Sequence, residues 1–223
     1  GKDDVDDDEE TVFSYTVADD SGNTDTAFIE MTTTPCFVAG TLIDTASGPV
    51  AVEELEPGDM VMTRDHGAQP LRWIGRSRRR AEAADAPVRF AAGTLGAHQE
   101  LELSPCHRVL LTDKWAEVLF GTAEVLVKAR DLVNGSTIVT DMAVRKVTYV
   151  HLLLSNHQVL WANGVESESF HPASASMSAL DTADRIRLTG LLPGLERDPM
   201  SYGAYARRNL SASEAAILMH AAA

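Results

Sequence analysis

The feature that most constrains the fold is a succession of short apolar, β-branched segments between residues 36 and 170, each followed by turn-forming residues. Clusters such as Ser47-Gly48-Pro49 and Pro57-Gly58-Asp59 interrupt this region at short intervals. Frequent Gly, Pro, Asn and Asp between short strands are typical of all-β domains. We therefore predict an all-β domain over residues 36–170, with strands at 41–43, 50–55, 60–62, 71–74, 87–91, 100–104, 108–112, 124–127, 137–140, 144–153 and 158–162.

The composition changes after His171-Pro172, where residues 171–223 become rich in Ala, Leu and Glu at helical spacing. We predict helices over Met177 to Leu192 and Ser211 to Ala223, separated by Pro193-Gly194. This C-terminal extension is expected to pack on the β domain.

Residues 12–33 have the pattern of a hairpin, because two alternating segments flank a polar turn over 19–23. The hairpin looks like the last one of the cadherin-like repeats in large bacterial surface and secreted proteins. That resemblance implies a secreted or cell-surface location, with residues 1–35 as a leader. Two interpretations of the turn stay open, a plain polar turn and a calcium site, since its oxygen-bearing residues alternate as calcium ligands could: Asp19, Ser21, Asn23 and Asp25.

The negative charge is concentrated at the start of the chain. Residues 1–30 hold 11 acidic residues and one lysine, whereas the remainder holds 22 acids and 18 bases out of totals of 33 and 19. Nucleic-acid binding needs clustered positive charge, so we expect no such partner. The short basic run Arg76, Arg78, Arg79 and Arg80 is expected to be a solvated loop. No apolar segment is long enough for a membrane span.

The two cysteines, Cys36 and Cys106, are too few for a disulfide scaffold and form no Cys-x-x-Cys pair. The seven histidines show no short ligand spacing, so we expect neither a metal nor another cofactor. A sparse pair of cysteines in a chain of this length more often includes a reactive thiol than a structural crosslink.

Cys36 begins the segment Cys36-Phe37-Val38-Ala39-Gly40-Thr41, and a second segment, Val50 to Val61, follows it with Pro57-Gly58-Asp59 inside. These segments resemble the opening of the Hint family, the self-processing fold shared by inteins and hedgehog C-terminal domains. The resemblance is greatest to bacterial Hint-domain proteins, and it implies that Cys36 is a nucleophile.

Two further motifs follow in the order of that family. Ser104 and His107 occupy the ends of its Thr-x-x-His element, and residues 147–164 resemble its closing hairpin. The resemblance makes Ser104 and His107 catalytic candidates, with His151 and His157 of the closing hairpin as further ones. Asp65, within Asp65-His66-Gly67, is a weaker candidate because a turn is the simpler interpretation of this segment. Glu168 to His171 also look like the bacterial branch.

The chemistry follows from the residues themselves. Cys36 lies one bond from the carbonyl of Pro35, so its attack on that carbonyl is intramolecular and gains effective molarity. A thiol with a pKa near ~8.5 supplies some thiolate near neutral pH. His107 is expected to protonate the leaving nitrogen, and Ser104 to place a hydroxyl at the same centre. We predict an N-to-S acyl shift at the Pro35–Cys36 bond.

The sequence also predicts that the reaction stops short of splicing. Splicing needs a terminal Asn, usually after His, and the segment after Asn163-Gly164 contains no His-Asn pair. The thioester would then pass residues 1–35 to water, a thiol or an amine. We expect the leader to be the substrate and the chain to act as a monomer.

Three alternatives remain open at this stage. The domain is a catalytically silent Hint scaffold, or the chain is a calcium-binding segment of a surface adhesin. The third alternative concerns Cys106, which could form a disulfide with Cys36 that silences the nucleophile until it is reduced; a thiol that points away from Cys36 is the simpler interpretation.

Overall fold

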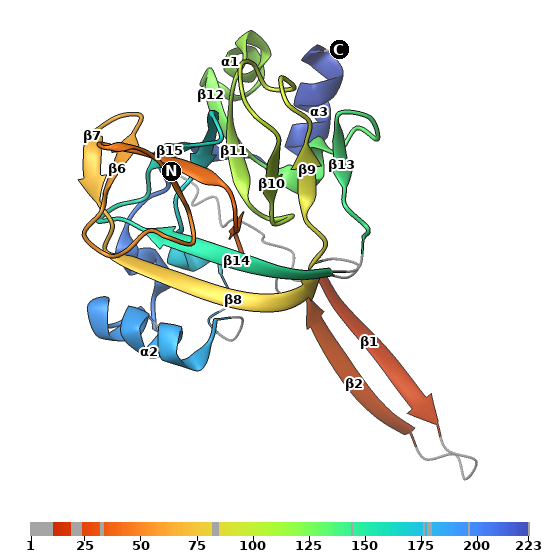
Figure 1. Cartoon of the computed structure of the whole chain (residues 1–223). Helices are drawn as coiled ribbons and strands as arrows, with labels where there is room; N and C mark the ends of the chain where they lie inside the picture. Colours follow the sequence, from red (N-terminus) through yellow and green to blue (C-terminus); the bar gives the residue numbers. More distant parts are fainter. Residues whose placement is uncertain are drawn as a thin grey trace.

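The computed structural model describes residues 11–18, 24–31, 34–81, 85–143, 145–175, 177, 180–195 and 197–222, and of the first two ranges only the backbone. These two ranges form the predicted hairpin: β1 (Thr11–Ala18) pairs antiparallel with β2 (Thr24–Met31). Figure 1 draws the hairpin in red and orange as a sheet of its own. The acidic run over residues 3–10 and the calcium candidates in the 19–23 turn lie outside the described residues.

Two larger sheets carry the rest of the described strands. The first has the order β13-β9-β10-β3-β14-β8, and the second has the order β17-β12-β11-β16-β15-β4-β6-β7, with β5 paired to β4. The strands are β3 (Phe37–Val38), β4 (Leu42–Thr45), β5 (Gly48–Ala51), β6 (Met60–Thr63), β7 (Gly67–Pro70), β8 (Trp73–Ala81), β9 (Val88–Phe90), β10 (Leu101–Leu103), β11 (Arg108–Thr112), β12 (Glu124–Lys128), β13 (Ile138–Thr140), β14 (Arg145–Leu153), β15 (Val159–Ala162), β16 (Val165–Glu168) and β17 (Arg208–Asn209).

One apolar core joins the two sheets. Leu103 and Val150 of the first sheet share a buried cluster with Ile43, Val109 and Leu160 of the second. Burying an aliphatic side chain of this size stabilises a fold by about 2 kcal/mol. The short strands therefore hold together through shared packing, since a pair of them alone would be marginal in water.

The all-β class is confirmed, and most predicted strands appear within a few residues of their expected places. The prediction for the basic run was wrong. Arg76, Arg78, Arg79 and Arg80 belong to β8, which pairs with β14 along its whole length from Trp73 opposite Leu153 to Ala81 opposite Arg145. Long cross-strand pairing overrides the local preference of charged residues for solvated loops. Figure 1 shows β8 and β14 as two long strands that run side by side.

The helices lie mostly where the sequence predicts them. The extension contains α2 (Thr182–Leu191) and α3 (Ala212–Ala222), and a short helix that the sequence analysis missed, α1 (Lys114–Phe120), precedes β12. The Asp113 side chain caps α1 by accepting the Trp115 N–H, and Gly121 ends it in the left-handed conformation at φ 75°. Within the described residues no helix has the length and apolar character to cross a membrane.

The C-terminal extension packs on the β domain as expected. Trp73 and Leu153, opposite each other on β8 and β14, share a buried cluster with Leu188 of α2 and with Tyr202. The indole of Trp73 donates to the carbonyl of Asp184 at 3.2 Å, and the Asp184 carboxylate accepts the backbone N–H of Arg76 at 2.7 Å. The first sheet is thus covered by α2 through apolar contacts and two specific hydrogen bonds.

This packing generates a prediction about Gly75, which lies opposite His151 in the β8–β14 pair. A Cβ at Gly75 would lie 2.3 Å from the ring of Trp73, so Gly75→Ala must displace the indole from its pocket. Overpacking of this kind costs about 1–3 kcal/mol of the free energy of unfolding. Urea denaturation measures the loss.

Gly190 of α2 provides the matched control, because a Cβ there meets nothing within 4 Å. We expect Gly190→Ala to leave the free energy of unfolding unchanged or to raise it by up to ~1 kcal/mol, since alanine favours helices. Equal effects of the two substitutions would contradict the role assigned to Gly75.

Candidate active site

The nucleophile candidate is positioned by β3, a strand of two residues that pairs on both sides. On one side Phe37 lies opposite Leu103 of β10, and on the other side opposite Val150 of β14. In antiparallel pairing each step forward on one strand is a step backward on its partner. The residue before Phe37 is Cys36, and it therefore meets Ser104 after β10 and His151 within β14.

Ser104 contacts the scissile amide directly. The backbone N–H of Cys36 donates to the Ser104 hydroxyl at 2.8 Å, and this hydroxyl donates to the carbonyl of Thr34 at 2.9 Å. The backbone of Ser104 in turn donates to the carbonyl of Cys36 at 3.0 Å. The hydroxyl is buried and fixed at the nitrogen that would leave in cleavage.

His151 bridges the carbonyl and the sulfur of the candidate reaction. Its Nδ1 lies 2.8 Å from the carbonyl oxygen of Pro35, and its Nε2 lies 3.6 Å from the Sγ of Cys36. A carbonyl oxygen can only accept, so Nδ1 carries the hydrogen and the Nε2 of the neutral ring presents its lone pair to the sulfur. The thiol itself is placed to donate to the carbonyl of Thr34 at 2.9 Å.

His107 lies behind Ser104 and not at the scissile bond. Its backbone N–H donates to the carbonyl of Ser104 at 3.1 Å, which closes the turn that carries the hydroxyl. Its buried ring packs on Phe37 with the centroids 4.3 Å apart, and neither ring nitrogen has a hydrogen-bond partner among the described residues. In this structure the His107 ring therefore makes no hydrogen bond to the scissile nitrogen, to which it was expected to donate a proton.

Burial dominates the electrostatics of the site. It raises the pKa of the Cys36 thiol far above the ordinary value, against the opposing effects of the Arg79 charge and the Ser104 hydrogen bond. Burial lowers the pKa of His107 to about 4, and it lowers the pKa of His151 to about 4 although the Pro35 carbonyl favours the charged form. At neutral pH the site thus holds a protonated thiol beside uncharged imidazoles.

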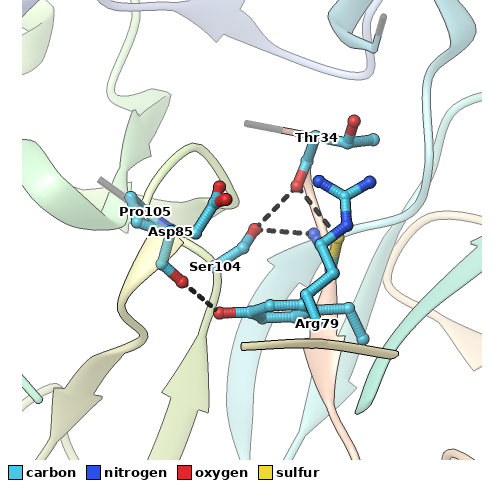
Figure 2. A pocket seen from close by; sticks show the side chains of 7 residues that line it. Thr34, Arg79, Asp85, Ser104 and Pro105 are labelled. Carbon is cyan, nitrogen blue, oxygen red and sulfur yellow. Dashed lines mark hydrogen bonds between the residues drawn. The ribbon is translucent and has the colours of Figure 1, made fainter. Parts of the chain in front are cut away.

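A small cavity of about 10 Å³ opens beside the sulfur, which is room for about one water molecule. The hydroxyl of Tyr149 donates to the carbonyl of Asp85 at 2.6 Å and closes one side of it. Figure 2 shows the hydrogen bonds that meet at the Ser104 hydroxyl, with Arg79 and Asp85 around them. The lining residues are Thr34, Cys36, Arg79, Asp85, Ser104, Pro105 and Tyr149.

A family model described as a Hint domain matches residues 35–174, well over half of the chain. The chain belongs to the Hint domain family. Its first matched residues, Pro35 and Cys36, are the two that flank the candidate scissile bond. The Hint assignment and the all-β fold class predicted from the sequence are both confirmed.

Solved structures to which the chain is similar include the bacterial intein-like domain of Clostridium thermocellum, which is 17% identical with a TM-score of 0.45 and aligns with 62% of this chain and 99% of its own. The DnaB intein of Synechocystis is 13% identical with a TM-score of 0.40 and aligns with 60% of this chain and 98% of its own. No curated protein sequence matches the chain. Self-processing in general is the activity that membership in this family supports.

His157 belongs to a second buried polar cluster of the Hint domain. Its Nε2 donates to the Glu168 carboxylate at 3.2 Å, and its Nδ1 accepts the backbone N–H of Ala206 at 2.9 Å. Arg108 approaches the same carboxylate at 3.6 Å. Burial alone would raise the pKa of Glu168, but the charge of Arg108 and the His157 hydrogen bond lower it to about 2. Both ring nitrogens of His157 are therefore engaged away from Cys36.

Asp65 is likewise not brought to Cys36. Its carboxylate accepts two hydrogen bonds from the Arg207 guanidinium, at 2.8 and 3.0 Å. These hydrogen bonds are the main reason why the pKa of the Asp65 carboxyl is lowered. Its neighbour His66 contacts the side chain of Gln158 at 2.8 Å. Asp65 and Arg207 tie the 64–66 turn to the C-terminal extension.

Cys106 lies in the turn between Ser104 and His107 and is partly buried, whereas Cys36 is buried. No disulfide joins them; both are reduced thiols. Within the described ranges no group of three or more His, Cys, Asp and Glu side chains is arranged to hold a metal ion.

Sequence analysis missed Arg79, Asp85 and Glu168 as components of these clusters. Ser77 and Ala81 are small residues at every second position with Arg79, and this spacing is the signal that could have placed Arg79 on an inward face of a strand. No local pattern marks Asp85, because its place beside Cys36 depends on how β8 and β9 are packed. Glu168 was noted as part of a family-like segment, but its ion pair with Arg108 is a tertiary contact.

The buried histidines predict a pH dependence of stability. His107, His151 and His171 have pKa values lowered to about 4, whereas an unfolded histidine binds its proton near ~6.5. Between these values the unfolded state holds more protons, so the free energy of unfolding should fall as the pH drops from ~6.5 to ~4. Each histidine contributes about 3 kcal/mol at most to this loss. Urea denaturation across this range measures it.

His107→Leu is the variant that isolates one of these groups, because its ring nitrogens have no hydrogen bonds to lose. We expect it to be at least as stable as the natural chain near pH 4 and to show a shallower pH dependence. The contribution of Glu168 to the free energy of unfolding is lost over a lower pH range, since its carboxylate is protonated only as the pH falls towards about 2. An unchanged pH slope in His107→Leu would contradict the assignment.

Proposed function

We propose that this Hint domain cleaves its own backbone by an N-to-S acyl shift at the Pro35–Cys36 bond. The observation that carries the proposal is the position of His151, which contacts the scissile carbonyl at 2.8 Å and faces the nucleophilic sulfur at 3.6 Å. A base for the thiol and a donor for the developing oxyanion are thus supplied by one imidazole.

In the first step the thiol proton moves from Sγ of Cys36 to Nε2 of His151, and the sulfur attacks the carbonyl carbon of Pro35. The atoms Sγ, Cβ, Cα and N of Cys36 close a five-membered ring with that carbon. Negative charge develops on the carbonyl oxygen, where the Nδ1–H of His151 already donates. The donor is in place before the charge forms, which is the arrangement that stabilises such intermediates most.

In the second step the bond between the Pro35 carbon and the Cys36 nitrogen breaks, and the nitrogen must gain a proton to leave as an amine. The Ser104 hydroxyl, 2.8 Å away, is the group positioned to pass this proton on. The Ser104 oxygen then regains a proton from the imidazolium of His151, so that the proton lost by the thiol balances the one gained by the nitrogen, and the products are a thioester and an amine. His107 is assigned to holding the Ser104 turn and not to direct proton donation.

Water is the acceptor that best fits the space beside the sulfur, since the cavity there has room for about one water molecule. Attack of that water on the thioester would release residues 1–35 and restore the Cys36 thiol. A small external thiol would give the same cleavage by exchange. The burial of the thiol supports a slow first step and hence an intact chain that persists as a precursor.

Intact-mass measurement tests cleavage directly. Incubation of the chain with dithiothreitol should yield two fragments, residues 1–35 and 36–223, because the small thiol captures the thioester. Cys36→Ala should give no fragments. Cys106→Ala is the matched control and should cleave at the natural rate under reducing conditions. An intact mass for the natural chain under all thiol concentrations would instead favour a catalytically silent scaffold.

A second test compares the roles proposed for His151 and His107. We expect His151→Ala to lower the cleavage rate by a factor of about 100 or more, since it removes base and oxyanion donor together. Ser104→Ala should slow cleavage by a similar factor. His107→Leu should slow it less than either. His220, exposed on α3, is the control, and His220→Ala should leave the rate unchanged. A stronger effect of His107→Leu than of His151→Ala would overturn this assignment.

The disulfide between Cys36 and Cys106 stays a proposal about regulation. Its formation would remove the nucleophile, and reduction would restore it. Cleavage induced by hydroxylamine, which needs no reductant, should be lost in oxidised chain and retained in Cys106→Ala under oxidising conditions. Equal cleavage of oxidised and reduced chain would defeat this proposal.

A further inference from the structure

The inward face of β8 brings an arginine to the nucleophile. Ser77 and Ala81 are buried, while Arg78 and Arg80 between and beside them are exposed, so the odd-numbered side chains of this segment face the interior. Arg79 shares that face and is only partly exposed. Arg79 is thus a charged side chain on the face of β8 that is otherwise buried here.

The strand register fixes where Arg79 points. Arg79 lies opposite Val147 of β14, and Val147 belongs to the buried cluster that contains Cys36, together with Ala81 and Tyr149. The Arg79 side chain enters the cavity that Cys36 also lines. Figure 2 draws Arg79 next to Thr34, near the hydrogen bonds at the Ser104 hydroxyl.

We propose that the guanidinium of Arg79 is the cationic partner of the Cys36 thiolate and stabilises the negative charge on sulfur while the thiol proton leaves for His151. This inference deepens the acyl shift proposed above and rests on it for its catalytic meaning. The proton lost from Sγ is held on Nε2 of His151, so the step creates one thiolate and one imidazolium and balances in charge.

The need for such a partner follows from the surroundings of the sulfur. Burial is the largest influence on the thiol and opposes its ionisation, and Arg79 is the largest influence in the opposite direction. The other groups that act on the sulfur are the Ser104 hydroxyl, which favours the thiolate, and Cys106 and Asp85, which oppose it. Tyr149 and His151 approach from β14, and both are neutral near neutral pH because burial raises the pKa of Tyr149 and lowers that of His151.

Asp85 weakens the stabilisation that the Arg79 charge gives to the Cys36 thiolate. Its carboxyl lines the same cavity, burial raises its pKa, and the charge of Arg79 opposes that rise. Arg79 therefore acts on two acidic groups that line one cavity, the Asp85 carboxyl and the Cys36 thiol.

The test measures the reactivity of the thiol without depending on cleavage. Iodoacetamide labels Cys36 and Cys106 in the same sample at a fixed, mildly alkaline pH without added thiol, and peptide mapping by mass spectrometry gives the rate at each. In Arg79→Gln we expect labelling of Cys36 to slow about tenfold, because loss of a nearby opposite charge raises a pKa by at least one unit. Labelling of Cys106 provides an internal reference and should change much less.

Two further variants separate charge from structure. Arg78→Gln makes the same change of net charge on the exposed face of the same strand and should alter neither rate. Arg79→Lys keeps the charge and should restore most of the Cys36 rate. Where Arg79→Gln does not fold, Arg79→Met keeps the apolar stem and repeats the comparison.

The outcomes distinguish this inference from the proposed acyl shift. Slower labelling of Cys36 in Arg79→Gln, in a chain that never cleaves with dithiothreitol, would support the charge pairing and reject the acyl shift. Equal labelling rates in the natural chain and Arg79→Gln would overturn the pairing, whatever the cleavage result. When the charge pairing and the acyl shift are both correct, the dithiothreitol-induced cleavage rate should fall in Arg79→Gln by the same factor as the labelling rate of Cys36.

Discussion

The candidate site depends on one constraint, the pairing of β3 on both of its sides. Phe37 is opposite Leu103 of β10 and Val150 of β14, and this double register alone places Ser104 and His151 on either side of Cys36. A shift of one residue on either strand would turn the paired side chains to the opposite face of the sheet. The buried cluster that contains Phe37, Leu103 and Val150 resists such a shift, so the packing of the core and the geometry of the site are set by the same contacts.

Burial gives the site a resting state that differs from its reacting state. The thiol is protonated, the imidazole of His151 is uncharged, and the Ser104 hydroxyl is held by the scissile amide and by Thr34. The three groups that the proposed acyl shift uses for proton transfer, the thiol, the imidazole and the hydroxyl, are thus all neutral in the resting state. A low-dielectric interior makes ionisation costly and makes each oriented donor more effective once it has occurred. Under the proposed mechanism the first step is therefore slow.

Three buried histidines of the Hint domain, His151, His157 and His171, lie in two different surroundings. His151 faces the scissile bond, whereas His157 and His171 lie with Tyr205 in a cluster that binds the C-terminal extension through Ala206 and Gly203. His157 is held there by Glu168, which forms a buried ion pair with Arg108. Because the extension also packs on Trp73, whose ring lies 6.3 Å from that of His151, it supports the site from behind without contributing a reacting group.

The sequence by itself determined the fold class, the order of most strands, the two helices of the extension and the nucleophile candidate, because these follow from local periodicity, turn residues and ordered motifs. It also identified Ser104 and His151 among the candidates. What only the tertiary structure decided is which side chains meet. It placed His151 and not His107 at the scissile carbonyl, it moved His157 and Asp65 to contacts with the extension, and it turned an expected loop into β8 with Arg79 beside the sulfur. The physical reason is that strand register and shared packing couple residues far apart in the chain, and no local pattern encodes that coupling.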